Sequence, residues 1–124
     1  MNYTYIDGDN IGLRIEKSFL ENNENELGGI NERILFLIEN ISNHLLINGQ
    51  EIIFSGADGI ICKGQKIDIH SVRSYIQKIE KEITFSIGSG KSLKDSYIAL
   101  RYAKAKGKNI AILLDKGIFK TVEK

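Results

Sequence analysis

Apolar positions follow two rhythms along the chain, one typical of helices and the other typical of strands. Apolar residues recur every three or four positions in four segments, which predicts helices with one face on a core: 11–19, 30–45, 69–79 and 93–104. Short apolar or alternating runs predict five strands: 2–6, 51–54, 60–63, 83–88 and 109–114. The predicted order is strand, helix, helix, strand, strand, helix, strand, helix, strand.

Polar and small residues separate these elements. The run from Glu21 to Glu26 predicts a surface loop, with the long second helix beginning after Gly28 and Gly29. The segment Ser55–Gly59 predicts the turn of a hairpin between two short apolar runs. Because those runs are continuous rather than alternating, we expect the two hairpin strands in the middle of a sheet.

The order of elements predicts an α+β fold of the ferredoxin-like (RRM-like) kind. Such a fold has an antiparallel central sheet with helices on one face, here with one added helix and one added strand. Polymerase palms share this plan. A chain of 124 residues is close to the usual size of one domain, so residues 1–124 are predicted to form a single domain.

Charge and composition exclude several classes of partner. The 17 Lys and Arg against 16 Asp and Glu give a net charge of +1, too small for bulk electrostatic binding of nucleic acid. No apolar run approaches the roughly 20 residues of a membrane span, and the N-terminus lacks a basic region followed by an apolar one. The lone cysteine, Cys62, suits a reducing compartment, so a cytoplasmic protein without membrane insertion is predicted.

Acidic residues stand at two predicted strand ends that the hairpin would bring together. Asp7 and Asp9 follow the first strand, and Asp58 lies in the hairpin turn. Hard cations such as Mg²⁺ or Mn²⁺ take oxygen ligands, and Asp7, Asp58 and the carbonyl of Gly8 form such a set. The alternative is that these residues simply form turns, since Asp beside Gly is common there.

Small residues and lysines near these acids suit a bound phosphate chain. Gly56, Ala57 and Gly59 leave room for a substrate beside the turn. The helix that begins near Asn10 and Ile11 would present backbone N–H groups to an anion.

The end of the last helix adds positive charge. Lys104 and Lys108 lie about one turn apart and could clamp β- and γ-phosphates from one edge. The alternative is an ordinary solvated helix end, where lysines complement the helix dipole.

Two other motifs carry no function. The segment Gly88–Ser92 resembles the end of a P-loop, but Phe85 stands where that motif needs its first glycine, so Gly88 and Gly90 are expected to shape a turn. His44 and His70 have no His or Cys spaced as a zinc partner.

Four segments together resemble the GGDEF and CRISPR-polymerase palm superfamily, and most of all the minimal CRISPR polymerases (mCpol). The segments are 5–12 (YIDGDNIG), 54–62 (FSGADGIIC), 84–90 (TFSIGSG) and 99–109 (ALRYAKAKGKN). The resemblance covers nearly the whole chain and implies a palm with GGDEF-like additions. It assigns metal binding to Asp7, Gly8 and Asp58, triphosphate binding to Lys104 and Lys108, and a backbone phosphate cradle to 9–11.

The resemblance implies a nucleotidyltransferase that makes a cyclic di- or oligonucleotide from nucleoside triphosphates, ATP favoured over GTP. It also implies antiviral signalling through an effector that senses the product, and a homodimer that supplies two active centres. Two departures matter: Ala57 replaces the second glycine of the family turn, which is a mild change, and Gly59 replaces its second acid. Asp9 is predicted to compensate as a catalytic carboxylate. The alternatives are a non-catalytic nucleotide receptor and a protein-interaction module without a nucleotide site.

Overall fold

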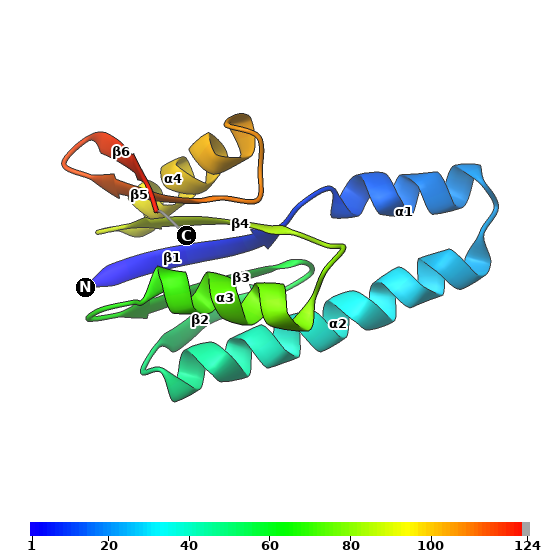
Figure 1. The fold of residues 1–124 in the computed structure, drawn as a ribbon, viewed down its shortest axis with the longest axis horizontal. Coiled ribbons are helices and arrows are strands. Elements are labelled where there is room, and N and C mark those ends of the chain that lie inside the picture. Colours follow the sequence, from blue (N-terminus) through cyan, green and yellow to red (C-terminus); the bar gives the residue numbers. More distant parts are fainter. Residues whose placement is uncertain (123–124) are drawn as a thin grey trace.

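The computed structural model describes residues 1–122, which form four helices and six strands (Figure 1). The strands are β1 (Asn2–Gly8), β2 (Glu51–Gly56), β3 (Gly59–Gly64), β4 (Phe85–Gly90), β5 (Ala111–Asp115) and β6 (Ile118–Thr121). The helices are α1 (Ile11–Leu20), α2 (Glu24–Ile47), α3 (Ile69–Ile79) and α4 (Leu93–Ala105). All the predicted elements are present, and the sequence pattern missed only β6, a short strand exposed along its whole length.

The strands form one six-stranded sheet in the order β2-β3-β1-β4-β5-β6. The first four pair antiparallel with β1 next to the centre, as the ferredoxin-like order predicts. β5 then joins β4 in parallel, and β6 pairs antiparallel with β5. The whole sheet is therefore mixed, because a parallel pair is possible wherever a helix crosses over between two strands.

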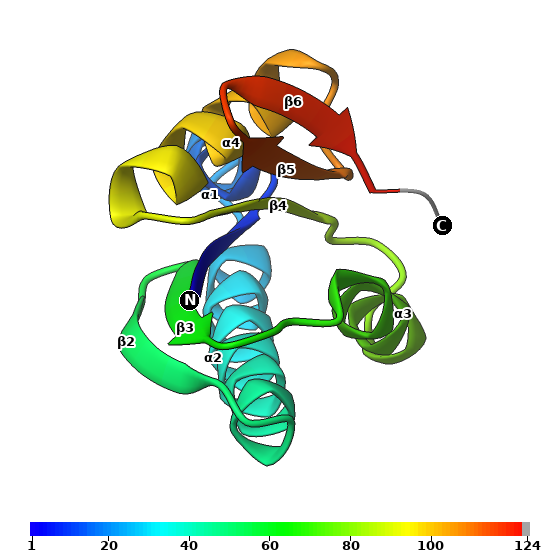
Figure 2. The same ribbon diagram turned by 90° about the vertical axis from the view of Figure 1, so that its left-hand side faces the viewer.

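Helices cover both faces of the sheet, whereas the sequence predicted one (Figure 2). α2 and α3 pack on one face, and α4 packs against β4 and β5 on the other. β4 packs against the helices on both faces of the sheet. Phe85 and Ile87 join the core under α2 and α3, whereas Gly88 faces α4. The crossover helix α4 between the parallel strands β4 and β5 therefore makes the second helical layer.

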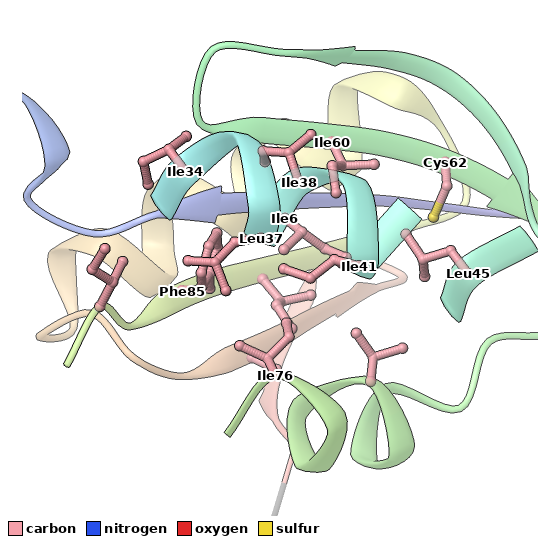
Figure 3. Packing of buried hydrophobic residues seen from close by; sticks show 14 of the residues in the cluster. Ile6, Ile34, Leu37, Ile38, Ile41, Leu45, Ile60, Cys62, Ile76 and Phe85 are labelled. Atoms are coloured by element: carbon pink, nitrogen blue, oxygen red, sulfur yellow. The ribbon is translucent and has the colours of Figure 1, made fainter. Parts of the chain in front are cut away.

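The main core lies between α2, α3 and the middle strands (Figure 3). Leu37, Ile41 and Leu45 come from one stripe of α2 and are fully buried, as are Ile6 and Ile60 on the facing strands. Burial of each such side chain stabilises the fold by about 1.5–3 kcal/mol. This layer fixes β1 and β3 side by side, which is what places the ends of those strands together.

α2 begins earlier than predicted, inside the polar run. The side chain of Asn23 accepts a hydrogen bond from the backbone N–H of Glu26 at 2.9 Å and caps the helix, and acidic residues fill its first turn. The helix therefore continues through Gly28 and Gly29, which the prediction placed before it. Although α2 has 24 residues, no helix within residues 1–122 combines the length and apolar character needed to cross a membrane.

The hairpin turn is tighter and lies nearer the sheet edge than predicted. Ala57 and Asp58 alone connect the strands, and Ala57 has a positive φ of 50°. β2 is an edge strand, so its apolar run does not mark a central position. The pairing register shifts between Ile52 and Phe54, and Ile53 and Phe54 are both exposed.

Gly88 and Gly90 lie within β4, not in a turn as predicted. A Cβ on Gly88 would overlap the backbone nitrogen of Leu100 and lie 2.5 Å from the carbonyl oxygen of Ser96. Glycine at this position therefore lets the backbone of α4 approach the sheet closely.

Gly88→Ala is expected to lower the free energy of unfolding by about 3 kcal/mol, because the colliding atoms are backbone and α4 has to move. Gly29→Ala is the matched control, since a Cβ there meets nothing within 4 Å. It should raise stability by about 0.5–1 kcal/mol, as expected for alanine in a helix. Urea unfolding of the two variants measures both effects, and equal stabilities would contradict the close packing of α4.

Candidate functional site

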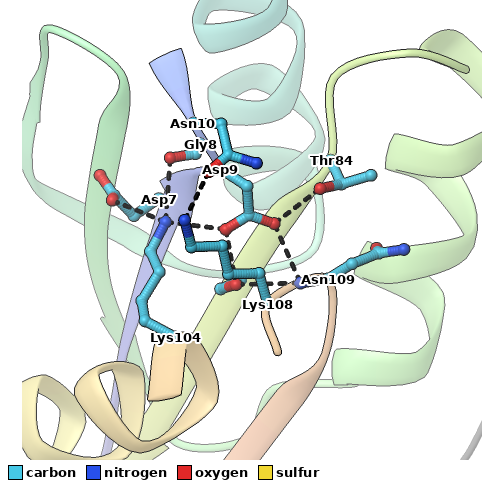
Figure 4. A network of polar contacts seen from close by, with 9 residues as sticks. Asp7, Gly8, Asp9, Asn10, Thr84, Lys104, Lys108 and Asn109 are labelled. Carbon is cyan, nitrogen blue, oxygen red and sulfur yellow. Dashed lines mark hydrogen bonds and ion pairs between the residues drawn. The ribbon is translucent and has the colours of Figure 1, made fainter. Parts of the chain in front are cut away.

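The ammonium group of Lys104 is the centre of a cluster of polar groups at the end of β1 (Figure 4). Its Nζ donates to the carbonyl oxygen of Gly8 at 2.9 Å and to Oδ1 of Asp9 at 2.8 Å, and lies 3.1 Å from Oδ2 of Asp7. The Lys104 side chain is only 11% exposed. A cation therefore sits among three oxygens at the strand end, and the predicted residues Asp7, Gly8, Asp9 and Lys104 lie together.

Asp9 is buried and fully engaged within the protein. Its carboxylate accepts hydrogen bonds from the hydroxyls of Thr84 and Ser86, each at 2.7 Å, and from the backbone N–H of Asn109 at 2.9 Å. Burial by itself would raise the pKa of Asp9, but hydrogen bonds from Lys104, Thr84 and Ser86 outweigh it and lower that pKa. Asp9 thus joins the end of β1 to the start of β4 and to the loop before β5.

Asp7 is more accessible than Asp9 and differs from it electrostatically. Its side chain is 22% exposed, against 1% for Asp9. Burial is the main cause that raises the pKa of Asp7, the nearby charge of Asp58 raises it further, and Lys104 opposes both. The carboxylates of Asp7 and Asp58 are therefore close enough to repel each other when both are ionised.

The hairpin turn is fixed directly against the end of β1. The carbonyl of Asp58 accepts a hydrogen bond from the backbone N–H of Gly8 at 2.9 Å, and Asp7 lies opposite Gly59 in the ladder. A Cβ on Gly59 would lie 2.9 Å from Oδ1 of Asp7 and 3.3 Å from the ring of Tyr5. The position of the missing second acid is therefore already crowded.

The oxygen atoms of Asp7, Gly8 and Asp58 fit a hard divalent cation as its ligands. Asp7 and the carbonyl of Gly8 already converge on one positive group, Lys104, and the Asp58 turn adjoins them. Carboxylate and carbonyl oxygens are the usual ligands of Mg²⁺, which also retains waters or substrate phosphates. Across residues 1–122 no three His, Cys, Asp or Glu side chains form a group able to hold a metal, so phosphate oxygens would have to complete such a shell.

Lys108 lies at the N-terminus of α1, on the same side of the molecule. Its Nζ donates to Oδ1 of Asn10, although the residue lies beyond the end of α4 and has a positive φ of 67° rather than continuing the helix. Asn10 makes no capping hydrogen bond to α1. The first turn of α1 therefore combines uncapped N–H groups with a lysine, which favours an anion.

The space beside two of the small residues is filled in the structure. A Cβ on Gly8 would lie 3.0 Å from the side chain of Ile11, so Ile11 occupies the space next to Gly8. The corresponding space at Gly56 lies against the ring of Phe54, 3.4 Å away. Open room lies beside Asp58 and beside Ala57, one of the residues predicted to leave space.

That room is a large apolar pocket, which the sequence did not reveal. It measures about 720 Å³ and lies between α1, α2 and the hairpin turn. Its lining comes from residues 11, 12, 15, 24, 27, 28, 30, 31, 34, 57 and 58. Apolar pockets of this size commonly bind small organic molecules. The apolar stripes of both helices were visible in the sequence, but they gave no sign that part of each stripe faces a cavity.

The comparisons with known proteins agree on one fold. A family model described as the minimal CRISPR polymerase domain (mCpol) matches residues 3–114. The active GGEEF domain of a diguanylate cyclase from Vibrio cholerae superposes with a TM-score of 0.68 at 17% identity, over 93% of this chain and 83% of that one. A diguanylate cyclase/phosphodiesterase from Caldicellulosiruptor saccharolyticus superposes with a TM-score of 0.65 at 12% identity, over 96% and 78%. At such identities the superpositions show the palm fold alone. No curated protein sequence matches the chain.

Asp9→Asn is expected to lower the free energy of unfolding by about 3 kcal/mol at neutral pH, since one acceptor oxygen becomes an NH2 donor among the donors around it and Lys104 loses a charged partner. The pKa of Asp9 is lower in the folded protein than its ordinary value of 3.8. Its contribution is therefore complete above that value and is lost as the pH falls through the folded-state pKa. Urea unfolding over a range of pH checks both the size and the loss of this difference from wild type.

Asp7→Asn is the matched control because the pKa of Asp7 is raised in the folded protein. A raised pKa means that the fold disfavours the ionised carboxylate, so the amide should be neutral or stabilising at neutral pH. Any gain should disappear as the pH falls through the folded-state pKa towards 3.8. Equal destabilisation by both variants would contradict the different roles of the two carboxylates.

Proposed function

Because the chain belongs to the minimal CRISPR polymerase (mCpol) family, we propose that it is a metal-dependent nucleotidyltransferase that makes a cyclic di- or oligonucleotide from nucleoside triphosphates. The observation that carries the proposal is the convergence of Asp7 and the Gly8 carbonyl on one cationic group beside the Asp58 turn. The apolar pocket lies on one side of this point and suits a nucleoside. The uncapped N-terminus of α1 lies on the other side and suits the phosphates.

The nucleoside would occupy the apolar pocket, and the triphosphate would cross the first turn of α1. Ile11 and Ile15 offer flat apolar surface for the base, and Glu24 and Asn31 offer polar groups at the pocket wall. Lys108 stands at the N-terminus of α1 and would neutralise the outer phosphates. Lys104 is held by protein oxygens, so we assign it the role of fixing the β1 end as well as attracting phosphate.

The reaction would join the 3′-oxygen of one nucleotide to the α-phosphorus of another, with release of pyrophosphate as its P–O bond breaks. Asp7, Asp58 and the Gly8 carbonyl would hold the divalent cation, Mg²⁺ or Mn²⁺. When bound, that ion supplies charge neutralisation at the reacting phosphate. Both oxygens of Asp9 are occupied by hydrogen bonds, so we propose a positioning role for it in place of the catalytic role predicted from the sequence.

Further elements of the proposal concern partners. Closing a ring from two nucleotides requires two bonds, so a homodimer with facing turns would provide two reaction centres. ATP is proposed over GTP, and the product would act on an effector in antiviral signalling. The free, buried Cys62, whose pKa is raised by burial to about 12, is compatible with a reducing compartment such as the cytoplasm.

A non-catalytic nucleotide receptor is the second candidate, and two observations favour it. Lys104 occupies the position between Asp7 and the Gly8 carbonyl, and Gly59 supplies no second acid at the turn. A receptor would keep the pocket and the lysines without a need for metal. The two candidates differ in whether any phosphodiester product forms.

Purified protein incubated with ATP or GTP and Mg²⁺ or Mn²⁺ is expected to give a cyclic product and pyrophosphate, identified by mass spectrometry. Asp58→Asn should abolish product, because it removes one of two acidic metal donors, while the fold stays intact. Lys63→Gln is the matched control, since this lysine pairs with Glu51 on the hairpin away from the turn. Unchanged turnover in Asp58→Asn would contradict the assigned metal set, and nucleotide binding without product in wild type would establish the receptor.

Gly59→Asp is expected to reduce product formation at least tenfold, even though it restores the acid common in the family turn. The new Cβ would approach Oδ1 of Asp7 to 2.9 Å and displace that carboxylate. Gly59→Ala separates the steric effect from the charge, and a titration with Mg²⁺ of both variants gives the measurement. A gain of activity in Gly59→Asp over an inactive wild type would instead identify a disabled palm.

A further inference from the structure

Arg73 on α3 is a buried cation with little compensation. The residue is 7% exposed, and its Nη2 donates to the backbone carbonyl of Asn109 at 3.2 Å. Within residues 1–122 this is its one hydrogen bond, and no carboxylate lies within ion-pair distance of it. A guanidinium carries five N–H donors, and none of the Arg73 nitrogens is among the buried atoms without a partner in residues 1–122, so its remaining donors are accessible to a ligand.

A small polar hollow lies directly against this arginine. It measures about 170 Å³ and lies between α3, the start of β4 and the loop before β5. Besides Arg73, its polar lining includes Gln77, Lys81, Thr84 and Asn109. The Thr84 hydroxyl already donates to Asp9, so Arg73, Lys81 and Gln77 provide the positive charges and free donors around this space.

The one carboxylate in the wall does not neutralise these charges. Glu80 is occupied on its other side, where Arg33 Nε lies 2.5 Å from Oε1 and the backbone N–H groups of Glu82 and Ile83 donate to Oε2 at 2.9 and 2.8 Å. Burial would raise the pKa of Glu80, but the N–H groups and Arg33 outweigh it and lower that pKa. Glu80 is thus paired with Arg33, and among residues 1–122 no carboxylate forms an ion pair with Arg73.

We propose that this hollow binds a phosphate-sized oxyanion, at a site separate from the nucleotide pocket. The planar fork of Arg73 suits two oxygens of a phosphoryl group, and Lys81 lies in the same wall. About 170 Å³ is well below the roughly 300 Å³ at which pockets for drug-sized molecules begin, so the site takes the phosphoryl group and not a nucleoside. This inference does not depend on catalysis.

The site is connected to the cluster at the end of β1 through one residue. Asn109 accepts from Arg73 through its carbonyl and donates to Asp9 through its N–H. An anion that reorients Arg73 therefore acts on the peptide unit next to the one that holds Asp9.

The test follows the side-chain Nε–H signals of the four arginines by ¹⁵N NMR while orthophosphate is added. Arg73→Lys identifies the Arg73 signal by its loss. That signal should move saturably with phosphate but not with chloride at equal ionic strength, whereas the exposed Arg101 on α4 should not move saturably. Glycerol phosphate as a second titrant distinguishes a phosphomonoester from free phosphate as the preferred ligand.

Two variants separate this site from the nucleotide site. Lys108→Gln weakens phosphate binding at α1 and should leave the response of Arg73 unchanged. Lys81→Gln should weaken the response of Arg73 about tenfold, with nucleotide binding unaffected. An Arg73 signal that responds to chloride as it does to phosphate, or that loses its response in Lys108→Gln, would overturn the proposal. Neither result bears on whether the protein makes a cyclic product.

Discussion

The buried carboxylate of Asp9 is the constraint on which the rest of the site depends. It accepts hydrogen bonds from β4 and from the loop before β5 and pairs with Lys104 of α4. Segments a hundred residues apart in the sequence therefore meet at the end of β1. A carboxylate without these donors would be strongly disfavoured at that depth, so the fold and the ionisation of Asp9 support each other.

This arrangement explains how two aspartates two positions apart acquire different properties. Both oxygens of Asp9 accept hydrogen bonds from other parts of the protein, whereas Asp7 also contacts Lys104 but keeps a partly exposed side chain. The repulsion between Asp7 and Asp58 leaves an excess of negative charge that a cation would relieve. Lys104 provides that relief in the structure, and a divalent ion would compete with it for Asp7 and the Gly8 carbonyl.

The glycines near the site have unequal importance, which residue type alone did not reveal. Gly59 is required because the Asp7 carboxylate and the Tyr5 ring crowd the space where its side chain would lie. Gly88 is required because α4 lies directly on β4, although the sequence around it resembled a phosphate-binding loop. Gly28 and Gly29 are ordinary positions in α2, although residue type predicts a boundary there, because Asn23 caps the helix upstream of them.

Periodicity in the sequence determined the helices and five of the strands, and the order of elements determined the ferredoxin-like half of the sheet, because these follow from local spacing and short-range pairing. The sequence also singled out Asp7, Gly8, Asp58, Lys104 and Lys108, since charged and small residues at strand ends are visible without a structure. The second helical face, the edge position of β2 and the apolar pocket were decided only by tertiary packing. The direction of each carboxylate was decided there too: Asp9 points inward because donors from β4 and the β5 loop reach it only after the sheet has formed.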